Sequence, residues 1–143
     1  MGDYELHNEE IAVCIALLGA ELKSLKDIHS GREYMWSGDP AFWKRVSPVL
    51  FPLVGNYRNK QAVYEGKAYP LSQHGFARDR EFTLVSQTDE EAWFALESDE
   101  TTRECYPFDF RLELGYRLSG REVEVLWRVK NTGKETMYFS IMP

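Results

Sequence analysis

Residues 110–129 read FRLELGYRLSGREVEVLWRV, and this stretch decides the fold class. Apolar side chains alternate with charged or small ones through residues 110–117 and again through residues 123–130, with Ser119 and Gly120 between the two runs. Alternation with a period of two is typical of strands that bury one face, and Ser-Gly is a turn signal. The stretch therefore predicts an antiparallel hairpin with one buried face.

The same alternation recurs along the rest of the chain. Further strands are expected at residues 11–17, 20–24, 33–36, 81–85, 92–96 and 136–141, and a hairpin is expected at residues 64–69. Helical signals are limited to short turns at residues 40–43 and 101–106. We therefore predict an all-β protein, an antiparallel β-sandwich, with residues 1–143 in a single domain.

Composition argues against several kinds of partner. The net charge is −6, whereas proteins that bind nucleic acid are usually basic, because neutralising phosphates supplies much of their affinity. No apolar run approaches the ~20 residues that a membrane helix needs. Cys14, Cys105 and the three histidines lack the spacing of metal ligands. We expect no nucleic-acid partner, no membrane partner and no metal, and two free thiols without a secretory signal predict a cytoplasmic location.

Two irregular, polar stretches at residues 47–60 and 70–80 interrupt the strand pattern and hold the candidate site residues. His74 can donate or accept a hydrogen bond and can act as a general acid, although it can equally be a structural loop histidine. Arg58 and Arg78 carry forked donors that match hydroxyls, carboxylates or phosphates, and surface ion pairs are the alternative for each.

Aromatic and acidic side chains near these stretches are less specific. A platform for the apolar face of a sugar ring is one interpretation of the aromatic set, and core packing is the other. The aromatic candidates are Trp36, Phe42, Trp43, Tyr57 and Phe76. The carboxylates are Asp39, Asp79, Glu81 and Asp109, and no pair among them has a spacing that assigns an acid and a base.

Residues 73–78 (QHGFAR), preceded by residues 47–58 (SPVLFPLVGNYR), resemble the aldose 1-epimerase (galactose mutarotase) superfamily, in its LacX-like and glucose-6-phosphate 1-epimerase-like branch. The His-Gly-Phe-Ala-Arg run is the most specific part of the resemblance. Further similar segments follow in the family's order across nearly the whole chain, at residues 19–25, 34–36, 39–43, 106–108, 110–112 and 131–133.

The resemblance implies a large antiparallel β supersandwich that interconverts the α and β anomers of an aldose, here a hexose or hexose phosphate. In this family a carboxylate base takes the proton of the anomeric hydroxyl while a histidine acid protonates the ring oxygen. Rotation about the freed C1–C2 bond and reclosure give the other anomer. The resemblance implies no cofactor, since only protons move.

The family's functional residues transfer to three positions of this chain. His74 matches the catalytic-site histidine that bonds the sugar near its ring oxygen. Arg58 matches the arginine that binds sugar hydroxyls, and Arg78 stands in the same motif as His74 as a second substrate contact. Asn56 and Asp79 flank these positions and are weaker candidates.

Two of the family's catalytic groups match nothing in residues 1–143: the second histidine, which is the general acid, and the catalytic glutamate. We therefore expect the N-terminal portion of a longer domain, an incomplete sandwich, and self-association through open sheet edges. Whether this chain is itself an enzyme stays open. The alternatives are a non-catalytic carbohydrate-binding β-sandwich and a structural fragment without a ligand.

Overall fold

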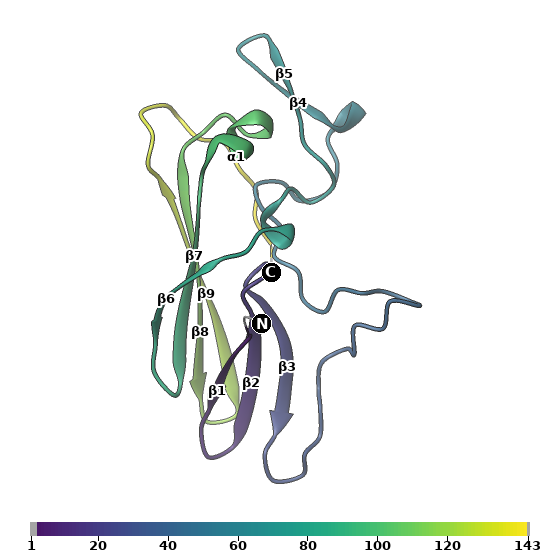
Figure 1. The fold of residues 1–143 in the computed structure, drawn as a ribbon, viewed down its shortest axis with the longest axis vertical. Coiled ribbons are helices and arrows are strands. Elements are labelled where there is room, and N and C mark those ends of the chain that lie inside the picture. Colours follow the sequence, from purple (N-terminus) through teal and green to yellow (C-terminus); the bar gives the residue numbers. More distant parts are fainter. Residues whose placement is uncertain (1–2, 143) are drawn as a thin grey trace.

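The computed structural model describes residues 3–142 and consists mainly of antiparallel strands (Figure 1). One sheet has the order β1-β2-β3 and contains β1 (Asp3–His7), β2 (Ile11–Ala16) and β3 (Glu21–Asp27). A second sheet has the order β6-β7-β8-β9 and contains β6 (Thr83–Gln87), β7 (Glu91–Glu97), β8 (Phe110–Ser119) and β9 (Glu122–Asn131). A separate hairpin joins β4 (Gln61–Tyr64) to β5 (Lys67–Pro70).

Helical structure is sparse in the described part of the chain. It comprises the helix α1 (Glu100–Cys105) and two single 3₁₀ turns, η1 (Arg58–Lys60) and η2 (Ala77–Asp79). Asp99 begins α1 through a capping box, because its carboxylate accepts from the backbone N–H of Thr102. No helix of residues 3–142 is long and apolar enough to cross a membrane.

The all-β, antiparallel prediction is confirmed, and the hairpin at residues 110–129 is its clearest part. Strands β8 and β9 pair without a register shift from Phe110 opposite Asn131 to Ser119 opposite Glu122. The hairpin around Glu65 and the helical turn after residue 100 are also present. Strand β1 was not predicted, because its five residues carry too few apolar side chains to show a period.

Two predicted strands are wrong. At residues 33–36 a single bridge joins Glu33 to Lys26, and the Glu33 carboxylate accepts from the backbone N–H groups of Leu25 and Met35 at 2.8 and 3.2 Å. A side chain that occupies these donors ends the ladder there. Residues 136–141 form no strand either. This segment crosses to residues 50–54, where its backbone makes isolated bonds such as Ser140 N–H to Pro52 O, 2.9 Å.

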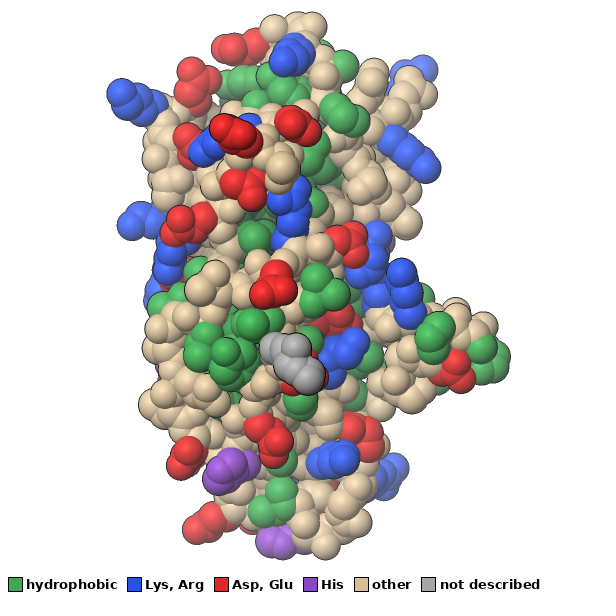
Figure 2. Space-filling model, in the orientation of Figure 1, with side chains coloured by type: hydrophobic (Ala, Val, Ile, Leu, Met, Phe, Trp, Pro, Cys, Tyr) green, Lys and Arg blue, Asp and Glu red, His purple; other side chains and the backbone are tan. Residues whose placement is uncertain are grey.

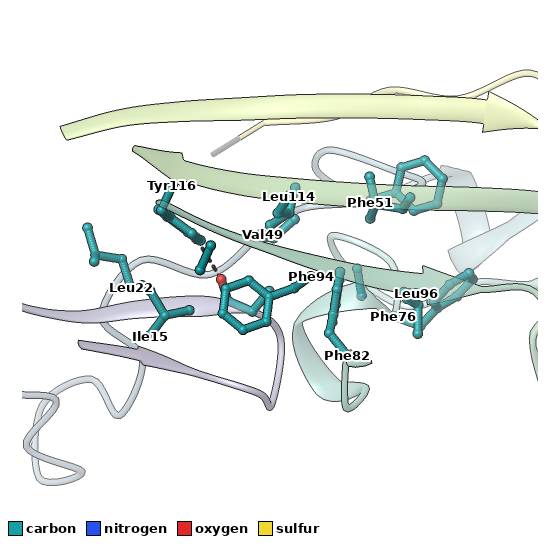
Figure 3. Close-up of a cluster of buried hydrophobic side chains, with 14 of the residues drawn as sticks. Ile15, Leu22, Val49, Phe51, Phe76, Phe82, Phe94, Leu96, Leu114 and Tyr116 are labelled. Carbon is teal, nitrogen blue, oxygen red and sulfur yellow. Dashed lines mark hydrogen bonds between the residues drawn. The ribbon is translucent and has the colours of Figure 1, made fainter. Parts of the chain in front are cut away.

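The core lies between the two larger sheets (Figure 3). Ile15 and Leu22 point up from the three-stranded sheet, and Phe94 and Leu114 point down from the four-stranded sheet. Burying an apolar side chain of this size contributes about 1.5–3 kcal/mol. The hydroxyl of Tyr116 crosses the interface and donates to the carbonyl oxygen of Ala20 at 2.5 Å. Burial raises the pKa of Tyr116 well above its usual value, so this hydroxyl stays a donor.

A second part of the core is an aromatic cluster centred on the fully buried ring of Phe51. Four aromatic rings surround it, with centroids 5.2–6.4 Å away, within the range in which aromatic pairs attract one another. These rings belong to Phe76, Tyr106, Phe110 and Phe139. They come from three separate stretches of chain, one of which leads into β8, so Phe51 joins the irregular part of the chain to the four-stranded sheet.

The long loop between β3 and η1 projects from the sheets (Figure 1). Its tip carries hydrophobic side chains (Figure 2). Phe42, on this loop, is 80% exposed. Its far end is anchored by the buried Glu21, whose carboxylate accepts from the N–H groups of Val46 and Ser47 at 2.6 and 3.0 Å. The buried carboxylate therefore fixes the chain where it enters the irregular stretch that holds the candidate site.

The outer face of the four-stranded sheet yields a prediction about acid stability. Glu113 is 8% exposed and accepts from Arg111 Nε at 2.7 Å and Arg128 Nη1 at 2.5 Å. These bonds hold the pKa of Glu113 below its usual 4.5, and the bond from Arg111 has the largest effect. A lowered pKa in the folded state gives stability that is present above pH 4.5 and is lost as the pH falls through the folded value.

We expect Glu113→Gln to lower the free energy of unfolding by about 2 kcal/mol at pH 7, because charge-assisted bonds are lost. The variant should also lose less stability than the unmodified chain between pH 5 and pH 3. Urea titrations at several pH values measure both effects. The control is Glu5→Gln, which replaces an exposed carboxylate on β1. Equal pH dependence in Glu113→Gln and the unmodified chain would contradict the assignment.

Candidate functional site

The carbonyl oxygen of Phe51 organises the turn that carries His74. It accepts from the backbone N–H groups of Phe76 and Ala77 at 3.1 and 3.2 Å. His74 and Gly75 both have positive φ angles, +62° and +73°. A Cβ atom on Gly75 would lie 2.3 Å from the Phe51 oxygen, so glycine is required for this close approach. The turn is thereby held against the core immediately before η2.

Two reciprocal hydrogen bonds fix the His74 ring. The His74 N–H donates to the Gly55 carbonyl, and the Gly55 N–H donates to His74 Nδ1, both at 2.8 Å. Because Nδ1 acts as the acceptor, the proton of the neutral imidazole lies on Nε2. His74 thus presents Nε2–H as its remaining donor. A hydroxyl or ring oxygen of a bound sugar is a suitable acceptor for such a group.

His74 and Arg78 line one hollow of about 500 Å³ on the same side of this turn. Its other walls come mainly from the loop that Glu21 anchors. The full lining is Trp43, Val46, Ser47, Pro48, Leu50, Gln73, His74 and Arg78. The hollow combines an aromatic ring, a hydroxyl, an amide, an imidazole and a guanidinium. These groups suit a polar ligand of the size of a monosaccharide.

The guanidinium of Arg78 is incompletely compensated. Its Nη2 donates to the Gln73 carbonyl at 3.0 Å, while its buried Nε has no partner among the described residues. Burial, and then the nearby charge of Arg45, lower the pKa of Arg78. Arg45 itself binds Asp79 at 2.8 Å, so the nearest carboxylate is already engaged. An anionic or hydroxyl-rich ligand would lower the free energy of this arrangement.

Arg58 lines a different hollow from the one that His74 and Arg78 line. Arg58 is exposed on η1, where Asn59 and Lys60 have positive φ angles of +58° and +54° and the chain reverses. This reversal directs Arg58 towards the β4–β5 hairpin and a hollow of about 590 Å³. Arg58 is three positions beyond Gly55, the partner of His74, which limits the distance between their Cα atoms to about 11 Å.

The second hollow is rich in tyrosine, which the sequence did not reveal. Its aromatic walls are Tyr57, Tyr64, Tyr69, Tyr106, Phe108 and Tyr138. The Tyr64 hydroxyl donates to Glu135 Oε2 at 3.0 Å, and this bond raises the pKa of Tyr64 to about 12. The two residues are 71 positions apart in the chain. No local pattern could have paired them.

The remaining candidates are dispersed. Phe76 is 8% exposed and belongs to the core, which agrees with the alternative that the aromatic candidates are packing residues. Trp43 lines the hollow beside His74, and Tyr57 lines the hollow beside Arg58. Trp36 and Phe42 form an exposed edge-to-face pair on the projecting loop, with centroids 6.4 Å apart. Two of the candidate carboxylates bind neighbouring residues of the chain. Asp39 accepts from the N–H of Ala41, and Asp109 binds Arg103.

Within residues 3–142 no three histidine, cysteine, aspartate or glutamate side chains come together in a group that could hold a metal ion.

The sheets and the His-Gly turn place the protein among the galactose mutarotase-like β-sandwiches. A structure of a galactose mutarotase related enzyme from Lactobacillus acidophilus superimposes with a TM-score of 0.96 at 42% identity, covering 97% of this chain and 46% of that one. A galactose mutarotase-like protein from Lactobacillus casei gives a TM-score of 0.95 at 35% identity, covering 98% of this chain and 48% of that one.

The sequence comparison agrees with the structural one. The sequence profile of the family described as Aldose 1-epimerase matches residues 2–141, and the chain therefore belongs to the aldose 1-epimerase family. The plasmid-encoded protein LacX of Lactococcus lactis subsp. lactis is 34% identical over 142 residues, which are 94% of this chain and 47% of LacX. The chain spans about half the length of the curated relatives it matches.

The close approach at Gly75 yields a prediction with a matched control. Gly75→Ala places a Cβ 2.3 Å from a backbone oxygen at positive φ, whereas Gly66→Ala, at φ +79°, meets nothing within 4 Å. We expect Gly66→Ala to cost about 1 kcal/mol of backbone strain and Gly75→Ala about 3 kcal/mol or more. Chemical denaturation measures both. Equal losses would show that the Phe51–Gly75 approach does not constrain the turn.

Proposed function

We propose that this chain provides the sugar-binding half of an aldose 1-epimerase site for a hexose or hexose phosphate, with His74, Arg58 and Arg78 as its ligand contacts. The observation that carries the proposal is the state of the His74 ring. Its Nδ1 accepts from the Gly55 N–H at 2.8 Å, which leaves Nε2–H as a donor at a hollow that Arg78 also lines.

In this proposal His74 acts on the ring oxygen of the sugar. A neutral imidazole that donates from Nε2 polarises that oxygen and orients the ring, but it gives up its proton far less readily than an imidazolium. His74 is therefore a contact that assists ring opening from the substrate side, and a separate acid completes the proton transfer. This role agrees with the position that His74 matches in the family motif.

The two arginines would bind the other polar groups of the ligand. Arg78, with its incompletely compensated guanidinium, suits an anionic group such as the phosphate of a hexose phosphate. Arg58 lies a short stretch of chain away from Gly55, and its long side chain can span from η1 to hydroxyls on the far side of the ring. Both arginines would bind the sugar without taking part in proton transfer.

Ring opening also needs a base at the anomeric hydroxyl. The described residues that line the His74 hollow include no aspartate or glutamate. General acid and base assistance contributes typically 10²–10⁴-fold per group. Within the proposal, the 143 residues bind sugar but are a poor catalyst by themselves. The same observation favours the second candidate function, a non-catalytic carbohydrate-binding β-sandwich.

Sugar binding is tested by NMR titration of the 143-residue chain with glucose and with glucose 6-phosphate. We expect shifts at His74 and the Gly55 amide, with tighter binding of the phosphorylated sugar. Arg78→Ala should remove the preference for phosphate, and His74→Ala should weaken binding of both sugars by about 0.5–1.5 kcal/mol. Arg32→Ala, on the turn after β3, is the control arginine. Absence of shifts at His74 with either sugar would refute a binding site here.

Catalysis is tested by polarimetry of freshly dissolved α-glucose and glucose 6-phosphate. With the 143-residue chain we expect anomerisation close to the rate in buffer, since a base and an acid are not among the matched positions. The Lactobacillus acidophilus relative, of which this chain covers 46%, serves as the longer comparison protein. Rapid mutarotation by the short chain that is abolished by His74→Ala would instead show a complete catalytic site within it.

A further inference from the structure

Strand β9 (Glu122–Asn131) is the last strand of the four-stranded sheet (Figure 1). Within residues 3–142 it pairs with β8 alone, so its other edge has no strand beside it. The ten residues contain no proline or glycine, and the pairing with β8 has no bulge that would twist the edge away. A long regular edge of this kind is a template for a further strand.

The hydrogen bonds identify which residues of β9 face the free edge. The N–H of Leu118 donates to Glu90 O at 2.8 Å, so the even-numbered residues of β8 face β7. The N–H of Thr132 donates to Asp109 O at 3.1 Å, so the even-numbered residues of β9 face β8. Since antiparallel bonding alternates along a strand, the odd-numbered residues of β9 point their N–H and C=O groups outward. These are Val123, Val125, Trp127, Val129 and Asn131.

The sequence of β9 is complementary to itself in the antiparallel direction. If a two-fold axis passes through Leu126, Glu122 lies opposite Lys130 of the second strand and Glu124 lies opposite Arg128. On the other face the same register places Val123 opposite Val129 and Val125 opposite Trp127. Opposite charges on one face and β-branched or aromatic pairs on the other are the pairs that stabilise antiparallel sheets.

Neighbouring registers keep only half of this match. With the axis at Val125, Glu122 lies opposite Arg128 but Glu124 lies opposite Leu126. With the axis at Trp127, Glu124 lies opposite Lys130 but Glu122 lies opposite Thr132. The axis at Leu126 also brings outward-facing residues opposite one another, so about eight backbone hydrogen bonds can form. Backbone geometry excludes an axis between two residues, and among the axes that pass through a residue charge complementarity favours Leu126.

We propose that β9 pairs with β9 of a second copy of this chain about a two-fold axis at Leu126, which joins the two four-stranded sheets into one continuous sheet. Ion pairs that are present within one chain would continue across the junction between the two sheets. Arg117 binds Glu91 at 2.8 Å and Glu124 at 3.5 Å, and Arg128 of the second copy continues this series of alternating charges. On the opposite face Val125, 39% exposed beside a small apolar hollow, is covered by the second copy's Trp127. This inference is independent of the sugar site.

Charge exchange at the ends of β9 tests the register. Neither Glu122 nor Lys130 forms an ion pair within the described residues, so changing them leaves the contacts of the single chain intact. Sedimentation velocity should show a dimer for the unmodified chain. Glu122→Lys and Lys130→Glu each create two like-charge pairs and should weaken the dimer about tenfold. An equimolar mixture of the two variants should recover the dimer, because every cross-strand pair is then of opposite charge.

Two further variants test the backbone and the axis. Val125→Pro removes an outward N–H and spares the bonds to β8, so it should abolish the dimer while circular dichroism retains the strand signal. Leu126→Cys places two thiols opposite each other across the axis and should form a disulfide-linked dimer on mild oxidation. Glu124→Cys is its control, because Glu124 faces Arg128 of the second copy and not itself.

The result that overturns the proposal is a folded monomer at all concentrations, or a dimer unaffected by Val125→Pro and by both charge variants. This register would be refuted if Glu122→Lys or Lys130→Glu formed a tighter dimer than the unmodified chain. It would also be refuted if an equimolar mixture of the two variants did not recover the dimer. The second half of the Lactobacillus acidophilus relative, added as a separate polypeptide, tests the competing occupant. If it forms a one-to-one complex that Val125→Pro prevents, while the chain by itself is monomeric, the edge accepts that polypeptide and not a second copy.

Discussion

The rest of the structure depends on the way Phe51 is held. Its ring is fully buried among four aromatic rings, and its carbonyl oxygen accepts from two successive N–H groups, those of Phe76 and Ala77. The ring ties the irregular chain to the four-stranded sheet, and the oxygen holds the turn after His74. Because the ring is immobilised by packing, the position of the oxygen, and hence of the His74 turn, follows from the core.

This constraint acts unequally on the candidate site residues. His74 is bound through both its backbone and its ring to Gly55, four residues beyond Phe51, and Arg78 follows within the same turn. Arg58 instead belongs to a chain reversal next to the β4–β5 hairpin, where its exposed side chain has few restraints. The chain therefore presents a donor fixed by two hydrogen bonds at His74 and an exposed cation at Arg58. That arrangement suits binding of a sugar better than concerted proton transfer.

The free edge of β9 has a different physical origin from the site. Regular alternation makes β8 and β9 a stable hairpin, but the same regularity leaves outward donors and acceptors with no partner within residues 3–142. The arrangement of charges along β9 favours a partner strand that places opposite charges across from its own in the antiparallel direction. The proposed self-pairing therefore depends on the tertiary edge and on the linear order of Glu122, Glu124, Arg128 and Lys130.

The sequence by itself determined the antiparallel β class, the hairpin at residues 110–129, and the motif around His74 that indicated the family. These features are local, since a period of two and a short motif can both be recognised within a few residues. Only the tertiary structure decided that residues 136–141 leave the sheet for residues 50–54, that Arg58 and His74 line separate hollows, and that Tyr64 meets Glu135. Each of these depends on contacts between segments distant in sequence, and no local periodicity records which distant segment becomes the partner.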